Sequence, residues 1–335
     1  MLFTVGFPTV LGMVMFSFDT PLENATNFYI SVTSLATSLK FGLYAYQLHK
    51  LFEIESIFRE LDSRIVEEQK PFAEMMHKRM RLVTNIFKGI YSSILINSEL
   101  SFLFRGERTL PFPAWFPLDW SESLINYSLA LLYQLGAIFV QIGQNFVDDL
   151  FPPLVLCLIA GHCELLIIRV SSIGYTKADH ADNDAELVRC IEDQEKLYKL
   201  LLLSMDIISL PMLVQFIVTG VDMAAVMFAL VFFVEDLSGR LYHISLLFAL
   251  LCQTFPICFF GTNLEHCFKR LHYASFCSNW VYQSRVYRKN VILFAERTKR
   301  HPRLLAGGMV PIELSTFVAS CKAAYSFFTL IGDFS

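Results

Sequence analysis

The chain contains 335 residues, of which 54% are hydrophobic and 17% are charged, and its mean hydropathy is +0.48. Roughly a quarter of the residues in soluble domains are charged, so this composition excludes an ordinary soluble protein and indicates a membrane protein with several spans. The formal net charge of −4 argues against a nucleic-acid partner.

Seven segments are apolar and long enough to cross a membrane. A helix needs about 20 mainly apolar residues to cross a hydrocarbon core of roughly 30 Å, because only internal hydrogen bonds satisfy its backbone in lipid. In chain order, the predicted spans are residues 2–18, 28–48, 86–104, 124–147, 201–234, 241–260 and 312–334. The sequence therefore predicts an all-α, seven-transmembrane helical bundle that the whole chain, 1–335, forms as a single domain.

The first predicted span is short and has no basic residue before it. The apolar region of a signal peptide is the alternative, but no charged leader with a small-residue cleavage site precedes Phe28. We interpret residues 2–18 as a complete or truncated span. The later spans have the same orientation under either interpretation.

The apolar run of the fourth span continues to residue 168. A helix of 45 residues, at about 1.5 Å each, reaches twice the hydrocarbon thickness. We expect Pro152 and Pro153 to break or kink it near the inner interface. Residues 185–203 have apolar positions that suit an amphipathic helix beneath the membrane. These features predict an intracellular base under the bundle.

The basic residues indicate which ends of the spans face the cytoplasm. Of the 27 lysines and arginines, 22 fall within residues 50–88, 169–199 and 269–303. Cytoplasmic loops collect such residues, so the amino terminus is predicted to be cytoplasmic and the carboxyl terminus extracellular. The sequon Asn24-Ala25-Thr26 lies in the first outer connection and makes Asn24 the predicted glycosylation site.

The residue pattern predicts no metal, cofactor or catalytic site. The eight cysteines lie in spans or in cytoplasmic segments, so we expect no disulfide framework. Cys163 and Cys267 each adjoin a histidine, but neighbouring side chains on a helix diverge and do not form a ligand set. We find no paired acids, nucleophile with a base, or phosphate-binding glycine loop, so the chain is not predicted to be an enzyme.

Two regions together carry a family resemblance. Residues 110–120 form a proline-rich aromatic connection. The carboxyl-terminal region contains Cys277-Ser278-Asn279-Trp280, then Ala306-Gly307-Gly308, interpreted as a turn into the seventh span, and the run from Lys322 to Leu330. These residues resemble the insect odorant receptor family over nearly the whole chain. Members of that family have seven spans in the inverted orientation that the charges predict.

The resemblance implies a subunit of a ligand-gated, non-selective cation channel in the plasma membrane of olfactory sensory neurons. It also implies a hetero-tetramer with a shared odorant co-receptor, and small volatile ligands. The co-receptor has a much longer second cytoplasmic loop than residues 169–199, so this chain resembles an odour-tuning subunit. Family members carry a cytoplasmic leader of some tens of residues before the first span, which this chain lacks.

The family pocket lies in the outer half of the bundle, among spans two, three, four and six. The resemblance therefore implies these odorant-binding candidates: Phe28, Tyr29, Val32, Glu99, Phe102, Tyr127, Leu131, Tyr133, Tyr242 and His243. Such a site is largely hydrophobic, with few polar groups to orient the ligand. Aromatic side chains in membrane helices also serve in packing and as interface anchors, so both interpretations stay open.

The resemblance makes the seventh span the pore helix. Ala319, Ala323 and Ser326 allow close helix approach. The implied pore and gate residues are Tyr325, Leu330, Asp333 and Phe334. Rings of Leu330 and Phe334 would close the pore by excluding water, and Asp333 would attract cations. The alternative for Leu330 and Phe334 is a lipid-facing helix end, and Lys322 reaches either the inner interface or a neighbouring subunit.

Three other classes of membrane protein are alternatives to an odorant receptor. A gustatory-type receptor channel would differ chiefly in ligand and partners, and residues 325–329, preceded by Lys322, favour the odorant branch. A G-protein-coupled receptor requires an external amino terminus, and the chain has neither an Asp-Arg-Tyr end to the third span nor an Asn-Pro-x-x-Tyr run in the seventh. A secondary transporter would show internal repetition, which we do not find.

Overall fold

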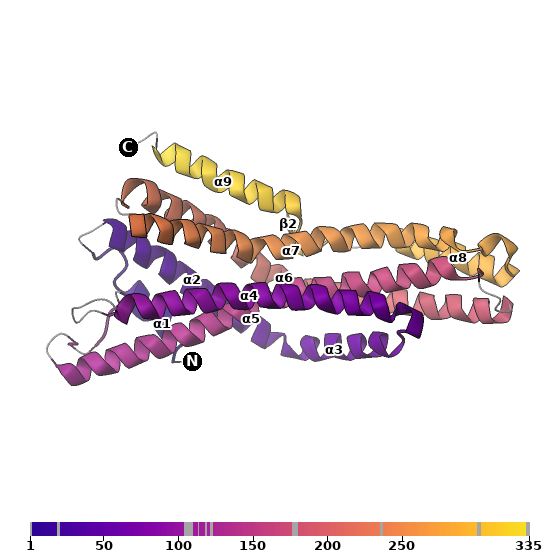
Figure 1. Cartoon of the computed structure of the whole chain (residues 1–335), viewed down its shortest axis with the longest axis horizontal. Coiled ribbons are helices and arrows are strands. Elements are labelled where there is room, and N and C mark those ends of the chain that lie inside the picture. The colour runs from indigo at the N-terminus through magenta and orange to yellow at the C-terminus, as the bar shows by residue number, and fades with distance from the viewer. Residues whose placement is uncertain are drawn as a thin grey trace.

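The computed structural model is an elongated bundle of long helices (Figure 1). It describes residues 2–18, 21–103, 110–112, 114–117, 119–120, 123–175, 180–234, 237–299 and 303–332. The helices in these residues are α1 (Gly6–Gly12), α2 (Pro21–Tyr46), α3 (Leu48–Ser63), α4 (Lys70–Leu103), α5 (Leu124–Ser172), α6 (His180–Phe232), α7 (Leu237–Cys277), α8 (Arg285–Thr298) and α9 (Leu314–Gly332). The short elements are η1 (Glu67–Gln69), η2 (Trp280–Tyr282), β1 (Leu305–Ala306) and β2 (Val310–Pro311).

Within the described residues, three helices are long and apolar enough to cross a membrane. They are α5, α6 and the part of α7 from Gly239 to Cys277. Ser123 starts α5 by accepting a hydrogen bond from the backbone N–H of Ile125. With 49 residues, α5 is about 74 Å long and extends well past a hydrocarbon core of roughly 30 Å.

Two features of the long helices differ from the sequence expectation. Pro152 and Pro153 lie inside α5, which runs through them without a break. Both prolines are buried, so neighbouring helices hold the segment in place although proline lacks a backbone donor. The expected amphipathic segment 185–203 and the predicted span 201–234 form one continuous helix, α6, which ends at Phe232.

The segment that we predicted as the first span, 2–18, contains only the seven-residue helix α1, flanked by turns. This helix rises about 10 Å. The segment runs antiparallel to α2: Ser38 donates to the carbonyl oxygen of Thr4, and the rings of Phe16 and Phe28 lie 5.9 Å apart. Leu11 of α1 is fully buried in a cluster with Ala137 of α5. The segment is therefore packed into the bundle along the amino-terminal half of α2.

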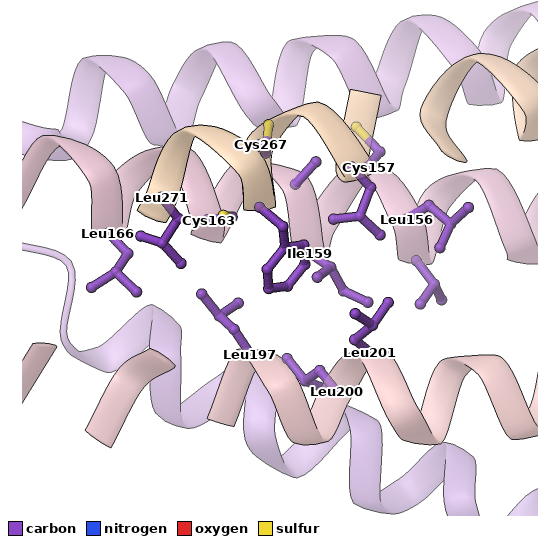
Figure 2. Close-up of a cluster of buried hydrophobic side chains, with 14 of the residues drawn as sticks. Leu156, Cys157, Ile159, Cys163, Leu166, Leu197, Leu200, Leu201, Cys267 and Leu271 are labelled. Atoms are coloured by element: carbon purple, nitrogen blue, oxygen red, sulfur yellow. The ribbon is translucent and has the colours of Figure 1, made fainter. Parts of the chain in front are cut away.

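The main hydrophobic core lies in the half of the bundle that contains α3 and α8. Figure 2 shows its centre, where side chains of α5 (Leu156, Cys157, Ile159, Cys163, Leu166) meet side chains of α6 (Leu197, Leu200, Leu201) and α7 (Cys267, Leu271). Full burial of a leucine or isoleucine stabilises the fold by about 1.5–3 kcal/mol. The eight cysteines are free thiols, and most of them serve here as small apolar groups.

The β1–β2 hairpin fixes the start of α9. Gly307 and Gly308 have positive φ angles of 59° and 71°, which form the turn expected before the seventh span. The Gly307 N–H donates to the carbonyl oxygen of Ser209 at 2.8 Å, which ties the hairpin to α6. A Cβ added at Gly261 of α7 would meet the carbonyl oxygen of Ile312 at 2.1 Å. Glycine at this position therefore lets α7 approach the chain that leads into α9.

Candidate ligand cavity and the helices around it

A cavity of about 1270 Å³ lies inside the bundle, next to α1 and the connection around residues 110–120. Typical ligand pockets have volumes of roughly 300–1,000 Å³, so this cavity has room for a small organic molecule. Helices α1, α2, α4, α5, α6 and α7 and the connection around residues 110–120 form its wall. The aromatic side chains that line it include Phe7, Tyr29, Phe87, Tyr91, Phe112, Trp120, Tyr242 and Phe248.

The cavity lies among the helices that contain predicted spans two, three, four and six, and α6 adds Asp222 and Val226 to the wall. It is far along the bundle from α3 and α8, where basic residues of the sequence are concentrated. One face of α2 supplies lining residues Thr26, Tyr29 and Thr33, which are spaced by three or four positions as on one side of a helix.

Two of the predicted odorant-binding residues, Tyr29 of α2 and Tyr242 of α7, line the cavity. Tyr29 is 5% exposed, and its buried hydroxyl lies beside the side chains of Tyr242 and Thr26. Tyr242 is 41% exposed and packs edge-on against the ring of His243.

Other candidates lie outside the described cavity wall. Phe28 packs on Phe16, and Val32 is partly buried on the adjoining face of α2. Tyr127 and Leu131 are partly buried on α5, while the Tyr133 hydroxyl donates to the carbonyl oxygen of Leu2 at 3.1 Å. His243 is buried, with its Nδ1 2.8 Å from the carbonyl oxygen of Gly239. Glu99 and Phe102 belong to α4, but their side chains fall outside the described part of the chain.

The proposed glycosylation residue, Asn24, already bonds to the backbone. Its side-chain amide donates to the carbonyl oxygen of Phe18 at 2.7 Å and accepts from the Phe18 N–H at 3.0 Å. The side chain is partly buried, so modification would require these two bonds to open.

A buried ion pair lies next to the cavity, whose wall includes three of its hydrogen-bond partners, Tyr91, Asn145 and Gln253. The Nζ of Lys40 lies 2.6 Å from Oδ1 of Asp149, and the two side chains are 1% and 2% exposed. Lys40 also donates to Gln215 at 2.6 Å and to Asn145 at 3.0 Å. The second Asp149 oxygen accepts from the hydroxyl of Tyr91 and the amide of Gln253, so the network joins α2, α4, α5, α6 and α7. The sequence placed Lys40 in an apolar segment but gave no partner for it.

A second set of ion pairs holds the base together. Asp193 of α6 accepts from Arg64 at 2.5 Å and from Arg169 of α5 at 2.6 Å. Lys196 donates to Glu60 of α3 at 2.6 Å. The imidazole of His162, whose Nε2 lies 3.3 Å from Oδ1 of Asp62, holds the pKa of Asp62 below its usual value. These contacts join the basic, predicted cytoplasmic stretches to the core.

Helix α9 packs on the bundle through one face and leaves another face open. The Leu314 N–H donates to Thr262 of α7 at 2.9 Å, and the Phe317 ring lies 5.6 Å from that of Phe255. Ala324 is buried in a cluster with Leu250, which also lines the cavity. The exposed face carries Val318, Ala319, Lys322, Ala323, Tyr325 and Ser326. The side chain of Leu330 falls outside the described part, as do residues Asp333 and Phe334.

Among the described residues, no group of three or more histidine, cysteine or acidic side chains is placed to hold a metal ion. The Cys267 thiol lies 3.8 Å from Glu164, and this contact is part of the packing between α7 and α5. The chemistry that the cavity supports is therefore recognition of a mainly apolar molecule by apolar walls and a few polar groups.

The helical bundle, in which three of the described helices are long and apolar enough to cross a membrane, and its mainly apolar cavity are typical of a membrane receptor for small molecules. A family profile described as "7tm Odorant receptor" matches residues 20–325. Odorant receptor 23a of Drosophila melanogaster is 44% identical over 321 residues, which cover 95% of this chain and 84% of that receptor. Odorant receptor 59a of the same species is 39% identical over 99% of this chain and 88% of its own length.

Solved structures show the same fold. The structure of the insect olfactory receptor OR5 from Machilis hrabei matches with a TM-score of 0.84 at 14% identity, covering 98% of this chain and 87% of that one. Its complex with eugenol gives a TM-score of 0.85 at 13% identity, over 99% and 87% of the two chains. The chain belongs to the insect odorant receptor family, and it is a membrane receptor of a family that is not an enzyme family. The predicted family and the all-α, seven-transmembrane fold are confirmed.

Proposed function

We propose that this receptor is the odour-tuning subunit of a ligand-gated, non-selective cation channel. A small volatile molecule binds in the cavity between α2, α4, α5, α6 and α7, and its binding opens a pore formed together with the odorant co-receptor. The observation that carries this proposal is the large, mainly apolar cavity, which suits a molecule recognised through dispersion and desolvation. The structure of OR5 from Machilis hrabei in complex with eugenol supports the proposal of a small organic ligand for this receptor.

The orientation that we propose follows from the positions of the charges. The basic stretches 50–88, 169–199 and 269–303 include α3 and α8, which lie toward the opposite end of the bundle from α1 and the cavity, and also the ends of α5 and α7. Positive segments resist translocation, so this end is cytoplasmic and the cavity lies on the outer side. Such a cavity is accessible to odorants that reach the plasma membrane of an olfactory sensory neuron from outside.

The proposed pore helix is α9. Its exposed face combines small residues with Lys322 and Tyr325, and such a face suits close packing against the same helix of neighbouring subunits. Tyr325, Leu330, Asp333 and Phe334 are the proposed pore and gate residues. Leu250 touches the cavity and packs with Ala324 of α9, which gives a direct contact between the ligand wall and the pore helix. A ligand opens the pore if it binds the open arrangement more tightly than the closed one.

Recording from transfected cells tests this function. Cells that express this chain with the co-receptor, and cells that express either chain alone, are exposed to an odorant panel while whole-cell current is measured. We expect an odorant-evoked cation current that requires both chains. Surface labelling of the receptor with no evoked current across a broad panel contradicts the proposal, as does a current of equal size when this chain is omitted.

A further inference from the structure

We propose that Asp222 is the polar anchor of the cavity and that it selects small, mainly apolar ligands carrying a hydrogen-bond donor, such as alcohols or amines. The inference rests on the proposed function, because it names the ligand class of the same cavity. Asp222 lies on α6, is 3% exposed and lines the cavity wall. The sequence analysis did not identify it, although an acid inside a membrane span commonly marks a functional site.

The hydrogen bonds of Asp222 leave one acceptor open. Its Oδ2 accepts from the hydroxyl of Thr33 at 2.7 Å. Its Oδ1 is buried and has no hydrogen-bond partner among the described residues. A buried acceptor needs a donor, so a ligand O–H or N–H placed at Oδ1 supplies the hydrogen bond that the described protein groups do not.

The surroundings of Asp222 explain why a ligand supplies this donor. Lys40, a buried cation in this half of the bundle, is already held by Asp149, Gln215 and Asn145. Tyr29 lies one helical turn before Thr33 on the same face of α2, and its side chain is close enough to Asp222 to interact with it electrostatically. Asp222 and Tyr29 thus form a small polar patch in an otherwise apolar wall, as expected for a site that orients one polar group of a ligand.

Functional groups differ in whether they satisfy Oδ1. An alcohol or an amine donates to it, and a protonated amine adds charge attraction. An ether of the same carbon skeleton has no donor and leaves Oδ1 unpaired on binding. A site with an unsatisfied acceptor discriminates against analogues that lack the matching donor. We therefore expect a preference of about tenfold, which corresponds to one hydrogen bond.

A direct binding measurement tests the anchor separately from channel opening. The full chain is purified with its co-receptor. Its thermal unfolding temperature is measured against the concentration of each compound in two series, whose members share a carbon skeleton and differ in the polar group. These series are 1-hexanol, hexylamine, hexyl methyl ether and hexane, and 2-phenylethanol, 2-phenylethylamine, 2-phenylethyl methyl ether and ethylbenzene. The alcohol and amine are expected to stabilise the wild-type receptor at about tenfold lower concentration than the ether in at least one series. Equal midpoints for alcohol, amine and ether in both series overturn the proposal without any variant.

Variants assign the preference to the carboxyl group. Asp222→Ala is expected to remove the difference between donor and ether. The isosteric Asp222→Asn has one acceptor oxygen, which Thr33 occupies, and places an NH2 donor at the Oδ1 position, so it should also lose the preference for alcohol and amine over ether. Asp206→Ala, at a 63% exposed acid on the same helix, is the matched control and should change neither. A donor preference that survives in Asp222→Ala overturns the proposal. Donor-selective binding without an evoked current supports the anchor and contradicts only the channel function.

Discussion

Lys40 of α2 and Asp149 of α5 form an ion pair of 2.6 Å between two almost fully buried side chains. Asn145, Tyr91 and Gln253, which bond to this pair, also line the cavity. The hydrogen bonds of this pair therefore hold together five helices of the cavity wall, α2, α4, α5, α6 and α7. Removing one partner of such a pair leaves a buried charge uncompensated.

Replacing Lys40 with methionine is expected to destabilise the receptor by about 3–5 kcal/mol, because Asp149 then keeps a buried charge without its cation. Thermal unfolding of the detergent-purified protein measures the effect. The double variant Lys40→Met with Asp149→Asn should recover a large part of the loss. If the single and double variants unfold at the same temperature, the charge of Asp149 is not what destabilises Lys40→Met.

Replacing Gly89 with leucine is expected to reduce odorant sensitivity by filling the cavity. Gly89 lies on the wall, and a Cβ added there meets no atom within 4 Å, so the larger side chain enters open space. A rise of about tenfold or more in the half-maximal odorant concentration, measured by whole-cell recording, is the expected result. Gly143→Leu is the matched control, because Gly143 is equally open and is absent from the cavity wall. Equal shifts in both variants would place the ligand elsewhere.

At the base, Asp193→Ala is expected to cost about 3–5 kcal/mol of stability, since Arg64 and Arg169 lose a shared, buried carboxylate. Glu55→Ala removes an exposed pair with Arg59 and should change stability by less than about 1 kcal/mol. The unfolding temperatures of the two variants test this contrast. A similar small change in both would show that the Asp193 pairs are as weak as a surface pair.

The stability of the base is expected to fall on acidification. The folded-state pKa of Asp62 is lowered, so the unfolded state binds the proton more readily. The contribution is fully present above the unfolded pKa of about 4 and is lost as the pH falls through the folded pKa. Asp62→Asn should flatten this part of the acid limb in thermal unfolding measured from pH 6 to pH 3. An unchanged acid limb would show that the Asp62–His162 contact does not contribute. The effect is small, since Asp62 is half exposed.

The sequence predicted features that depend on local pattern or on averages over a segment. Hydropathy identified α5, α6 and α7 as long apolar helices. The clustering of the basic residues distinguished one end of the bundle from the other. The turn at Gly307 and Gly308 was also predictable, because positive φ angles favour glycine. Each of these depends on residues that are close in the chain.

Side-chain contacts between distant segments were not predictable. Lys40 and Asp149 are 109 positions apart, and Thr33 and Asp222 are 189 positions apart, so no local pattern links either pair. Tyr29 lines the cavity while Phe28 packs against Phe16, and this difference depends on how α2 is rotated within the bundle. A hydropathy profile carries no information about that rotation.

The most direct test of the account is the position of a bound odorant in the assembled channel. A cryo-electron microscopy structure of this chain with its co-receptor, solved with an activating odorant, locates the ligand and α9 together. The account predicts ligand density between Tyr29, Asp222 and Tyr242, with α9 lining the central axis. Ligand density at another site, or α9 facing lipid away from that axis, would contradict it.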